Sequence, residues 1–431
     1  MSGTGERRAI VIGGGIIGVC TALELQRRQW HVTIVDRLAP GEGCSFGNAG
    51  ILAAQAVVPV AMPGLLRKVP SMLLDRESPL TVRLGSLPTT LPWLLHFRRA
   101  AKLERVNATA DAMKALNATS VELHEALARY AGVSHLIKPG RYLYVHRDAG
   151  QIDVENGLAW KLRRERGSEI EVLDGPALRE AEPELSPEYT RGVRVGPMGF
   201  TTNPFRLTQS YARLFEAKGG RVQRAEVTGL KPDGARVGVA TSAGRLEAET
   251  VVVAAGAWSL KLVAPLGLRL QLIAERGYHM TFPKAAIQLR HVISEMEGQF
   301  AVTPMEMGLR VAGTEELGKA DDPAAWRRAD VLQRQARRMF PNADLTGGTR
   351  WMGPRPGTPD SLPAIGPLPG HPNIFIAAGH GHLGLTGGPN TGRIVAAMAS
   401  HERLNMALEP YAPDRFSRSL RHAHHTAPRA Q

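Results

Sequence analysis

The feature that most constrains the fold is a run of closely spaced glycines near the start of the chain. Residues 13–18 read Gly-Gly-Gly-Ile-Ile-Gly, between an apolar segment at 8–13 and a segment with helical character at 19–28. A second apolar segment, 31–35, follows and is closed by Asp36. This order predicts a β-α-β unit, because parallel strands need a crossover connection and the glycines allow a tight turn into it.

The glycine spacing matches the G-x-G-x-x-G pattern of dinucleotide sites. Gly13 permits the turn, Gly15 lets a pyrophosphate approach the backbone, and Gly18 lets the helix pack on the strand. The phosphates would lie at the N-terminus of the helix, where free N–H groups favour anions. Asp36 would accept hydrogen bonds from both ribose hydroxyls, which favours FAD or NAD over NADP.

Three further segments favour FAD over NAD. Residues 41–50 (GEGCSFGNAG) predict a small polar loop that wraps the ribityl chain and presents N–H groups to the flavin ring. Residues 251–258 (VVVAAGAW) predict a buried strand that ends in small residues, which allow close approach of the cofactor. Residues 379–386 (GHGHLGLT) lead into the last helix, whose N-terminal dipole would point at the flavin N1–C2=O edge. No second glycine pattern indicates a separate NAD site.

The remaining segments predict a second, antiparallel sheet. With 431 residues, 43% of them hydrophobic, two intimately joined domains are expected. We predict an α/β fold with a Rossmann-type FAD-binding domain (glutathione reductase-like) and an interleaved antiparallel-sheet substrate domain. The FAD-binding domain would comprise 1–55, 199–259 and 346–415, the substrate domain 56–198 and 260–345, and a frayed tail 416–431. Helices are predicted over 102–131 (one or two), 204–218 with Asn203 as N-cap, 322–340 and 385–400.

The net charge of +13 suits nucleic acid, an anionic membrane surface or anionic substrates. No zinc-finger spacing and no aromatic pairs in a basic strand are present, so nucleic acid is not predicted as a partner. The apolar, proline-punctuated segment 51–97, with Arg67, Lys68, Arg98 and Arg99 nearby, allows peripheral membrane contact. The alternative interpretation is that this segment covers the substrate domain.

Localisation is predicted from what the sequence does not contain. There is no signal-peptide pattern and no uninterrupted apolar stretch of about 18 residues. The two cysteines, Cys20 and Cys44, do not predict a disulfide, because Cys20 falls in a predicted buried helix. We therefore expect a cytoplasmic protein, with association at the inner face of the plasma membrane as a further option.

Longer stretches resemble the D-amino acid oxidase-like family of flavoproteins, which includes glycine oxidase, sarcosine oxidase and D-amino acid dehydrogenase. The resemblance runs from about Ala9 to Phe416 and is nearest to the D-amino acid dehydrogenase and glyphosate oxidoreductase branch. It rests on 40–50 (PGEGCSFGNAG), 134–140 (SHLIKPG), 275–280 (ERGYHM), 303–314 (TPMEMGLRVAGT), 351–366 (WMGPRPGTPDSLPAIG) and 379–391 (GHGHLGLTGGPNT). The resemblance implies a two-domain flavin fold and noncovalent FAD.

The resemblance also implies a role for Arg355, in the run Gly-Pro-Arg-Pro-Gly-Thr-Pro-Asp at 353–360. In similar enzymes this arginine grips the substrate carboxylate, and a planar guanidinium between two prolines suits a bidentate clamp. The alternative is a structural ion pair with Asp360. Tyr278 matches a tyrosine that borders the substrate in similar enzymes; its alternative is a core tyrosine. Met305, Glu306 and Arg310 are weaker pocket candidates.

His380 and His382 flank the expected flavin edge, where either would donate to flavin or substrate. No third ligand of suitable spacing accompanies them, so no metal is predicted. Two residues depart from the family pattern. Leu385 stands where family dehydrogenases carry an aromatic residue, and Cys44 stands where similar sequences have a smaller or hydroxyl residue. Cys44 raises the alternatives of a covalent flavin, a redox-sensitive thiol or a small buried filler.

We therefore predict FAD-dependent oxidative deamination of a small amino acid, by hydride transfer from the α-carbon to flavin N5, followed by hydrolysis of the imine to an oxo acid. The first alternative is oxidation of a secondary amine or N-substituted glycine (glyphosate, sarcosine or D-proline-like) that releases glyoxylate. The second is a non-catalytic basic flavoprotein that binds RNA or a membrane. Oxygen, a quinone or a partner flavoprotein would accept the electrons.

The residues predicted to act on the substrate are Arg355, Tyr278 and His382. The residues predicted to bind the cofactor are Gly13, Gly15, Ile16, Ile17, Gly18, Asp36, Arg37, Ser45, Gly47, Asn48, Ala49, Gly50, Val227, Ala255, Gly256, Trp258, Gly353, His380, Gly381, His382, Leu383, Gly384, Leu385 and Thr386.

Overall fold

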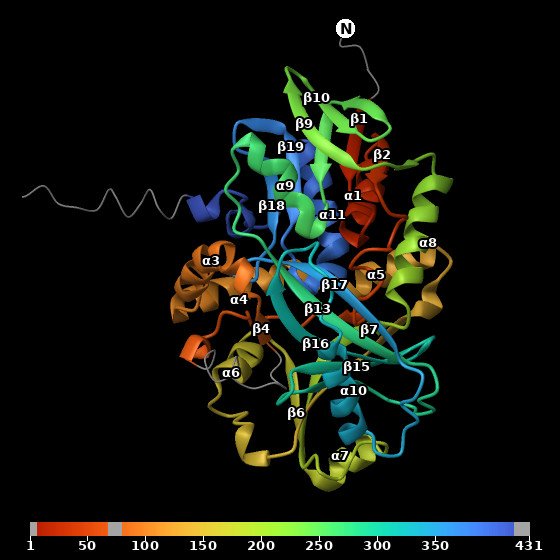
Figure 1. The fold of residues 1–431 in the computed structure, drawn as a ribbon, viewed down its shortest axis with the longest axis vertical. Coiled ribbons are helices and arrows are strands. Elements are labelled where there is room, and N and C mark those ends of the chain that lie inside the picture. The colour runs from red at the N-terminus through yellow and green to blue at the C-terminus, as the bar shows by residue number, and fades with distance from the viewer. Residues whose placement is uncertain (1–6, 68–79, 418–431) are drawn as a thin grey trace, which may run out of the picture.

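The computed structural model describes residues 7–67 and 80–417. Within these ranges, a mostly parallel sheet with its helices occupies the upper half of the molecule in Figure 1, and a larger, mostly antiparallel sheet occupies the lower half. The α/β fold class that the sequence predicts is confirmed. The predictions for Lys68 and for residues 418–431 of the tail lie outside the described residues.

The upper sheet has six strands. In order across the sheet they are β18 (Ala364–Leu368), β19 (His371–Ala378), β12 (Thr250–Val253), β1 (Arg8–Ile12), β2 (His31–Asp36) and β8 (Arg221–Arg224). Neighbouring strands are parallel except for β18 and β19. Both faces are covered, so successive residues of β1, such as Val11 and Ile12, enter two different cores. This explains why the strand is a continuous apolar run.

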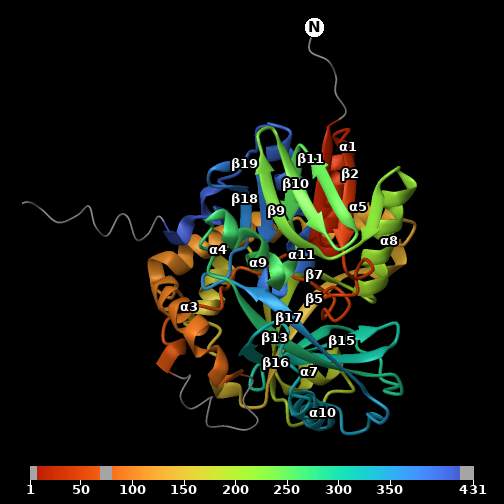
Figure 2. The same ribbon diagram turned by 45° about the horizontal axis from the view of Figure 1, so that its top comes forward.

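Helices cover one face of this sheet and a small sheet covers the other, as Figure 2 shows. The helices are α1 (Ile16–Arg27), α8 (Pro204–Ala217) and α11 (Gly384–Ala399), with α4 (Leu103–Asn117) and α5 (Ser120–Tyr130) packed outside them. The small sheet comprises β9 (Val227–Asp233), β10 (Arg236–Thr241) and β11 (Gly244–Ala248). Next to it lie the short helices η4 (Gly256–Trp258) and α9 (Ser259–Val263).

The lower sheet has ten strands. Its main path is β17 (Thr349–Gly357), β13 (Ile273–Phe282), β16 (Gly308–Gly318), β15 (Phe300–Met305), β14 (Val292–Glu295), β5 (Ile137–His146), β7 (Arg191–Thr201) and β3 (Ile51–Leu52). Strand β4 (Leu80–Val82) pairs with β16, and β6 (Glu169–Leu173) pairs with β7. Helices α3 (Leu87–Ala100), α6 (Leu158–Glu165), α7 (Gly175–Ala181) and α10 (Arg327–Met339) surround this sheet.

The helix predictions are confirmed except at boundaries. The 102–131 segment is two helices, α4 and α5, and α8 is capped by Asn203, whose Oδ1 accepts from the Arg206 backbone N–H at 2.9 Å. The helix predicted over 322–340 is α10, and it begins at Arg327 instead of near 322. The reason is that the carbonyls of Asp322 and Pro323 accept hydrogen bonds from the buried Arg276 guanidinium at 2.7 and 2.8 Å.

The two-domain division remains a proposal. All six strands of the upper sheet come from the three segments assigned to the FAD-binding domain. Strand β17 lies in one of those segments but pairs with β13 of the lower sheet. The two proposed domains therefore share a continuous boundary at β17, and that boundary is where the cavity described below lies.

Helix α3 presents leucines to solvent. Leu87, Leu91 and Leu95 are 45%, 61% and 56% exposed, and their spacing of four residues places them on one side of the helix. Arg98 and Arg99 lie in its last turn. This is the face at which the predicted membrane contact would occur, and the contact itself stays a prediction. Within residues 7–67 and 80–417, no helix is long and apolar enough to cross a membrane.

Candidate active site

A cavity of about 660 Å³ lies where the two sheets meet. The carboxyl ends of four parallel strands border it, through Ile12, Asp36, Ala254 and Ala378. This is the edge at which open α/β sheets bind ligands. Residues from the lower sheet and from α6 form the opposite wall. The cavity thus joins the nucleotide-binding edge of the upper sheet to the lower sheet and α6.

At the first end, the glycine turn exposes backbone groups. Helix α1 begins after Gly15, which provides no side-chain cap. The Ile16 N–H donates to Ser45 Oγ, so an anion would bind at the other N–H groups of the first turn. Asp36 shapes the turn because its carboxylate accepts from the Gly14 and Leu38 backbone N–H groups at 2.6 and 2.9 Å. Gly18 does not line the cavity; a Cβ there would lie 1.9 Å from the Gly13 carbonyl oxygen. Its role is helix–strand packing.

Aromatic and cationic side chains close this end. Arg37 lies 4.6 Å above the ring of Trp258, and both line the cavity together with Val227. The stack forms a flat wall beside Asp36, beyond the first helical turn. Such an arrangement fits the adenosine half of FAD, because it supplies a carboxylate for the ribose and an aromatic surface next to it.

The loop at 43–50 crosses from the glycine turn to the lower sheet. Ser45 Oγ accepts from the Ile16 backbone N–H at 3.0 Å and so ties the loop to α1. Arg310 donates to the carbonyls of Phe46 and Asn48 at 3.2 and 2.7 Å, so this pocket candidate anchors the loop from below. Gly50 does not line the cavity; its φ of +75° and its contact with Thr201 require a glycine there.

Gly47 of this loop is covered by the indole of Trp351. A Cβ on Gly47 would lie 2.1 Å from the Trp351 ring, and the ring itself stacks on His279 with centroids 5.0 Å apart. His279 is neutral, because burial lowers its pKa to about 3. Gly353 is likewise pressed against Trp351 and does not line the cavity. These contacts fix the loop position on which a flavin ring would rest.

A second uncapped helix N-terminus faces the cavity. The turn η6 (Gly381–Leu383) runs into α11, whose N-cap residue Leu383 makes no side-chain capping bond. His380 contacts Thr391 Oγ1 at 2.9 Å, and burial lowers its pKa to about 3, so its imidazole is uncharged at neutral pH. Leu385 and Thr386 also line the cavity. Two helix N-termini and a glycine-rich loop therefore surround one space, and this donor set fits FAD.

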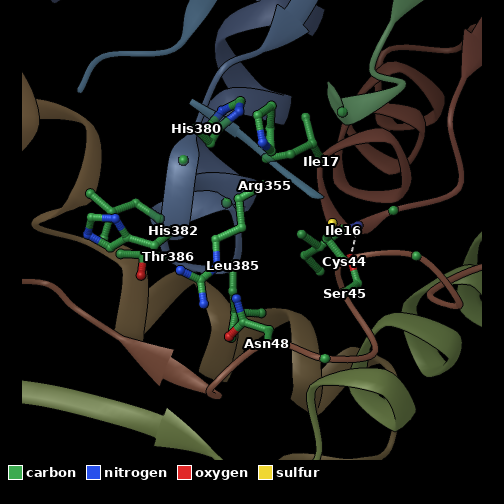
Figure 3. A pocket seen from close by; sticks show the side chains of 18 of the residues that line it. Ile16, Ile17, Cys44, Ser45, Asn48, Arg355, His380, His382, Leu385 and Thr386 are labelled. Carbon is green, nitrogen blue, oxygen red and sulfur yellow. Dashed lines mark hydrogen bonds between the residues drawn. The ribbon is translucent and has the colours of Figure 1, made fainter. Parts of the chain in front are cut away.

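Arg355 projects into the cavity between the segment that carries Asn48 and the segment that carries His382 (Figure 3). Its Nη1 donates to Glu315 Oε1 at 3.0 Å. The alternative pairing with Asp360 is not made, because Asp360 pairs with Arg415 at 2.8 and 2.9 Å. Burial lowers the pKa of His382, while Glu315 opposes that shift. Arg355 and His382 therefore share the cavity with a carboxylate that the sequence did not indicate.

Tyr278 is not at the cavity. It is 1% exposed, its hydroxyl donates to Glu316 at 2.7 Å, and it accepts from the Ala325 backbone N–H at 2.9 Å. The physical reason is strand alternation: on β13, Gly277 and His279 face Arg355 and Trp351, so Tyr278 faces the core below. This placement corrects the predicted substrate contact and fits the core alternative. Met305 does not line the cavity either, and Glu306 pairs with Arg206 at 3.0 Å.

Sequence reasoning missed the wall that the lower sheet and α6 contribute. It comprises Tyr142, Tyr144, Arg163, Met198, Ser294, Met296 and Glu315. The alternation of RYLYVH indicates that two tyrosines share one face of β5, but not which face. Arg163 lies 4.9 Å from the rings of both Tyr144 and Trp160, and it donates to the Tyr144 hydroxyl at 3.0 Å. No local pattern indicates that α6 reaches the cavity.

Cys44 lines the cavity as a protonated thiol. Its Sγ lies 3.0 Å from the Pro354 carbonyl oxygen, and burial raises its pKa to about 11. A thiol held in this form lacks the nucleophilic thiolate. Cys20 and Cys44 are both free. Among the described residues, no group of three His, Cys, Asp or Glu side chains could hold a metal ion.

Comparison with known proteins gives concordant matches along the chain. The family described as DAO, FAD dependent oxidoreductase, matches residues 8–398. The D-amino-acid oxidase of Bradyrhizobium diazoefficiens is 37% identical over 418 residues, 95% of this chain and 99% of that protein. The D-amino acid dehydrogenase of the same organism is 31% identical over 419 residues, with coverage of 95% and 99%. The glycine oxidase structure from Geobacillus kaustophilus has a TM-score of 0.72 at 22% identity, covering 94% and 98%.

Proposed function

Because this chain belongs to the DAO family of FAD-dependent oxidoreductases, we propose that it oxidises a small amino acid at the carbon beside the nitrogen. The resulting imine hydrolyses to an oxo acid and ammonia. The observation that carries this proposal is the position of Arg355, which lines the cavity near the uncapped N-terminus of α11. A guanidinium at that place binds and orients a carboxylate.

The chain's own residues divide the work along the cavity. Asp36 and the N-terminus of α1 would hold the adenosine and pyrophosphate, and the loop at 43–50 with the N-terminus of α11 would hold the flavin. When bound, FAD supplies the acceptor for a hydride from the substrate. Arg355 fixes the substrate carboxylate, so the α-carbon has one orientation, and such positioning accounts for much of the expected rate enhancement.

Arg163 favours a second candidate function, the oxidation of an N-substituted glycine or amino acid that carries another anion. Unlike Arg355, Arg163 has no carboxylate partner within residues 7–67 and 80–417. Its Nε is buried without a hydrogen-bond partner in the same ranges. A guanidinium stacked on two rings and lining the cavity would bind a phosphonate or second carboxylate, as in N-(phosphonomethyl)glycine.

Steady-state kinetics with D-alanine, D-aspartate and N-(phosphonomethyl)glycine separate the two candidates. If the second is correct, Arg163→Met raises KM for the two substrates with a second anionic group by about 10- to 100-fold, which corresponds to the loss of one charge-assisted hydrogen bond. The KM for D-alanine stays within about threefold. Arg164→Met is the matched control, because Arg164 is exposed and bonds to the carbonyls of Val154 and Glu155. An equal change in KM for D-alanine, D-aspartate and N-(phosphonomethyl)glycine would reject the second candidate.

A further inference from the structure

The inference concerns Glu315 and rests on the proposed function. Glu315 lies on β16 and lines the cavity, with 35% of its side chain exposed. Its Oε1 is 3.0 Å from Arg355 Nη1. An α-amino acid carries its ammonium and its carboxylate on the same α-carbon, so its two charges are separated by a similarly short distance. The Arg355–Glu315 pair is therefore the electrostatic complement of an amino-acid zwitterion.

Two glycines make room for this pair in the sheet. A Cβ on Gly277 would lie 2.4 Å from Arg355 Cζ, so only a glycine lets the guanidinium cross β13 and reach Glu315 on β16. A Cβ on Gly357 would lie 2.1 Å from Glu275 Oε1, so Gly357 leaves space for a second carboxyl group beside the pair. The missing side chains of Gly277 on β13 and Gly357 on β17 therefore leave the space that the Arg355 and Glu275 side chains occupy.

The protonation of Glu275 determines the net charge of the three side chains Glu275, Glu315 and Arg355. Burial first, and then the Glu315 charge, raise its pKa to about 8, against the opposing effect of Arg355. The charged groups that face it are Glu315 from β16 and Arg355 from β17, with Gly381 of η6 above it. At neutral pH Glu275 is therefore mostly protonated, and Arg355 with Glu315 gives a net charge of zero. A neutral group binds a zwitterion without burying an unpaired charge.

We propose that Glu315 binds the substrate ammonium group and takes a proton from it, while Arg355 holds the carboxylate. In this step an N–H bond breaks, an O–H bond forms on Glu315, and the electron pair stays on the nitrogen as the lone pair that drives loss of the hydride. No electron is transferred until the hydride leaves. Glu315 returns the proton to water when the product departs.

Docking of the substrate favours proton transfer to Glu315. Once the substrate carboxylate occupies Arg355, the Arg355 guanidinium is shared between Glu315 and a second anion, so it stabilises the charged carboxylate less. Desolvation acts in the same direction, because proton transfer from ammonium to carboxylate replaces two charged groups with two neutral ones. Glu275 is a positioning residue in this scheme. Above pH 8 it ionises and adds a negative charge beside Arg355, which weakens binding of the substrate carboxylate.

The test uses the FAD-loaded enzyme and anaerobic stopped-flow measurement of flavin reduction from pH 6 to 10. Glu315→Gln should lower the limiting rate by about 100-fold or more at pH 7, the usual contribution of a general base. The deficit should shrink at high pH, where the amine arrives already neutral. Propionate, which has a carboxylate and no ammonium, should perturb the flavin spectrum of Glu315→Gln at concentrations no higher than for the parent. Glu306→Gln, at an exposed ion pair, is the control.

The parent enzyme is expected to show a rise of KM above pH 8, and Glu275→Gln should abolish that rise. A rate deficit of Glu315→Gln that is the same at every pH would overturn the proposal, since a structural effect would not depend on the charge of the substrate. A parent enzyme that no amino acid reduces would instead overturn the proposed function. A parent that is reduced normally, together with a Glu315→Gln variant of equal rate at pH 7, would overturn only the role of Glu315.

Discussion

Arg355→Met is expected to lower kcat/KM for the amino-acid substrate by about 10²- to 10⁴-fold while FAD remains bound. The range follows from the loss of two charge-assisted hydrogen bonds, each worth about 1.5–3 kcal/mol, at about 1.4 kcal/mol per tenfold change. Arg355 contacts the substrate end of the cavity and not the glycine turn, so the flavin spectrum should be unchanged. Arg355→Lys should recover part of the loss, because lysine restores the positive charge but not the planar guanidinium that binds a carboxylate through two N–H groups.

The Arg355 result needs one control, because the variant also leaves Glu315 without its cationic partner. The double variant Arg355→Met/Glu315→Gln removes that unpaired charge. If the clamp is the cause, kcat/KM of the double variant with D-alanine stays well below that of Glu315→Gln alone; if the unpaired charge were the cause, the two would be equal. Full activity of Arg355→Met, with normal FAD content, would exclude Arg355 as the carboxylate clamp.

Gly13→Ala is expected to yield a protein that purifies with little FAD. Gly13 has a φ of +118°, and a Cβ there would lie 2.3 Å from the Ala254 carbonyl oxygen. Ala254 cannot easily move away, because its backbone N–H donates to the Ile12 carbonyl at 2.8 Å within the central strands. The backbone strain alone costs about 1–3 kcal/mol, and any shift of the turn also moves the N-terminus of α1. We expect FAD affinity to fall by about 100-fold.

Gly14→Ala is the matched control, because it adds the same methyl group one residue away. A Cβ on Gly14 would lie 3.4 Å from Pro40 Cα and 3.6 Å from Asp36 Oδ2, which is ordinary contact. The flavin-to-protein absorbance ratio and a fluorescence titration of the apoprotein measure the effect. FAD binding by Gly13→Ala that equals that of Gly14→Ala would contradict the assigned role of the glycine turn.

The expected cofactor end of the cavity is built from local sequence patterns. The turn at 13–18, Asp36 and the segment 379–386 each combine a recognisable spacing with an adjacent strand or helix, and the structure brings them to one cavity. Backbone groups perform most of the expected binding, so short motifs are sufficient to locate them.

The substrate end could not be predicted in the same way because it depends on register between distant strands. Glu315 meets Arg355 only because β16 and β17 both pair with β13. Tyr278 faces the core because neighbouring residues of a strand point to opposite sides, and the sequence alone does not indicate which side of β13 faces the cavity. Arg163 reaches the cavity from a helix that carries no motif.

Anaerobic mixing of the purified enzyme with D-alanine, D-proline, sarcosine and N-(phosphonomethyl)glycine, one at a time, tests the central claim most directly. The measured quantity is the visible absorbance of the flavin. Our account predicts that at least one of these amines bleaches the flavin and that one oxo acid or glyoxylate forms per flavin reduced. A yellow protein whose absorbance none of them changes would contradict amine oxidation as its function.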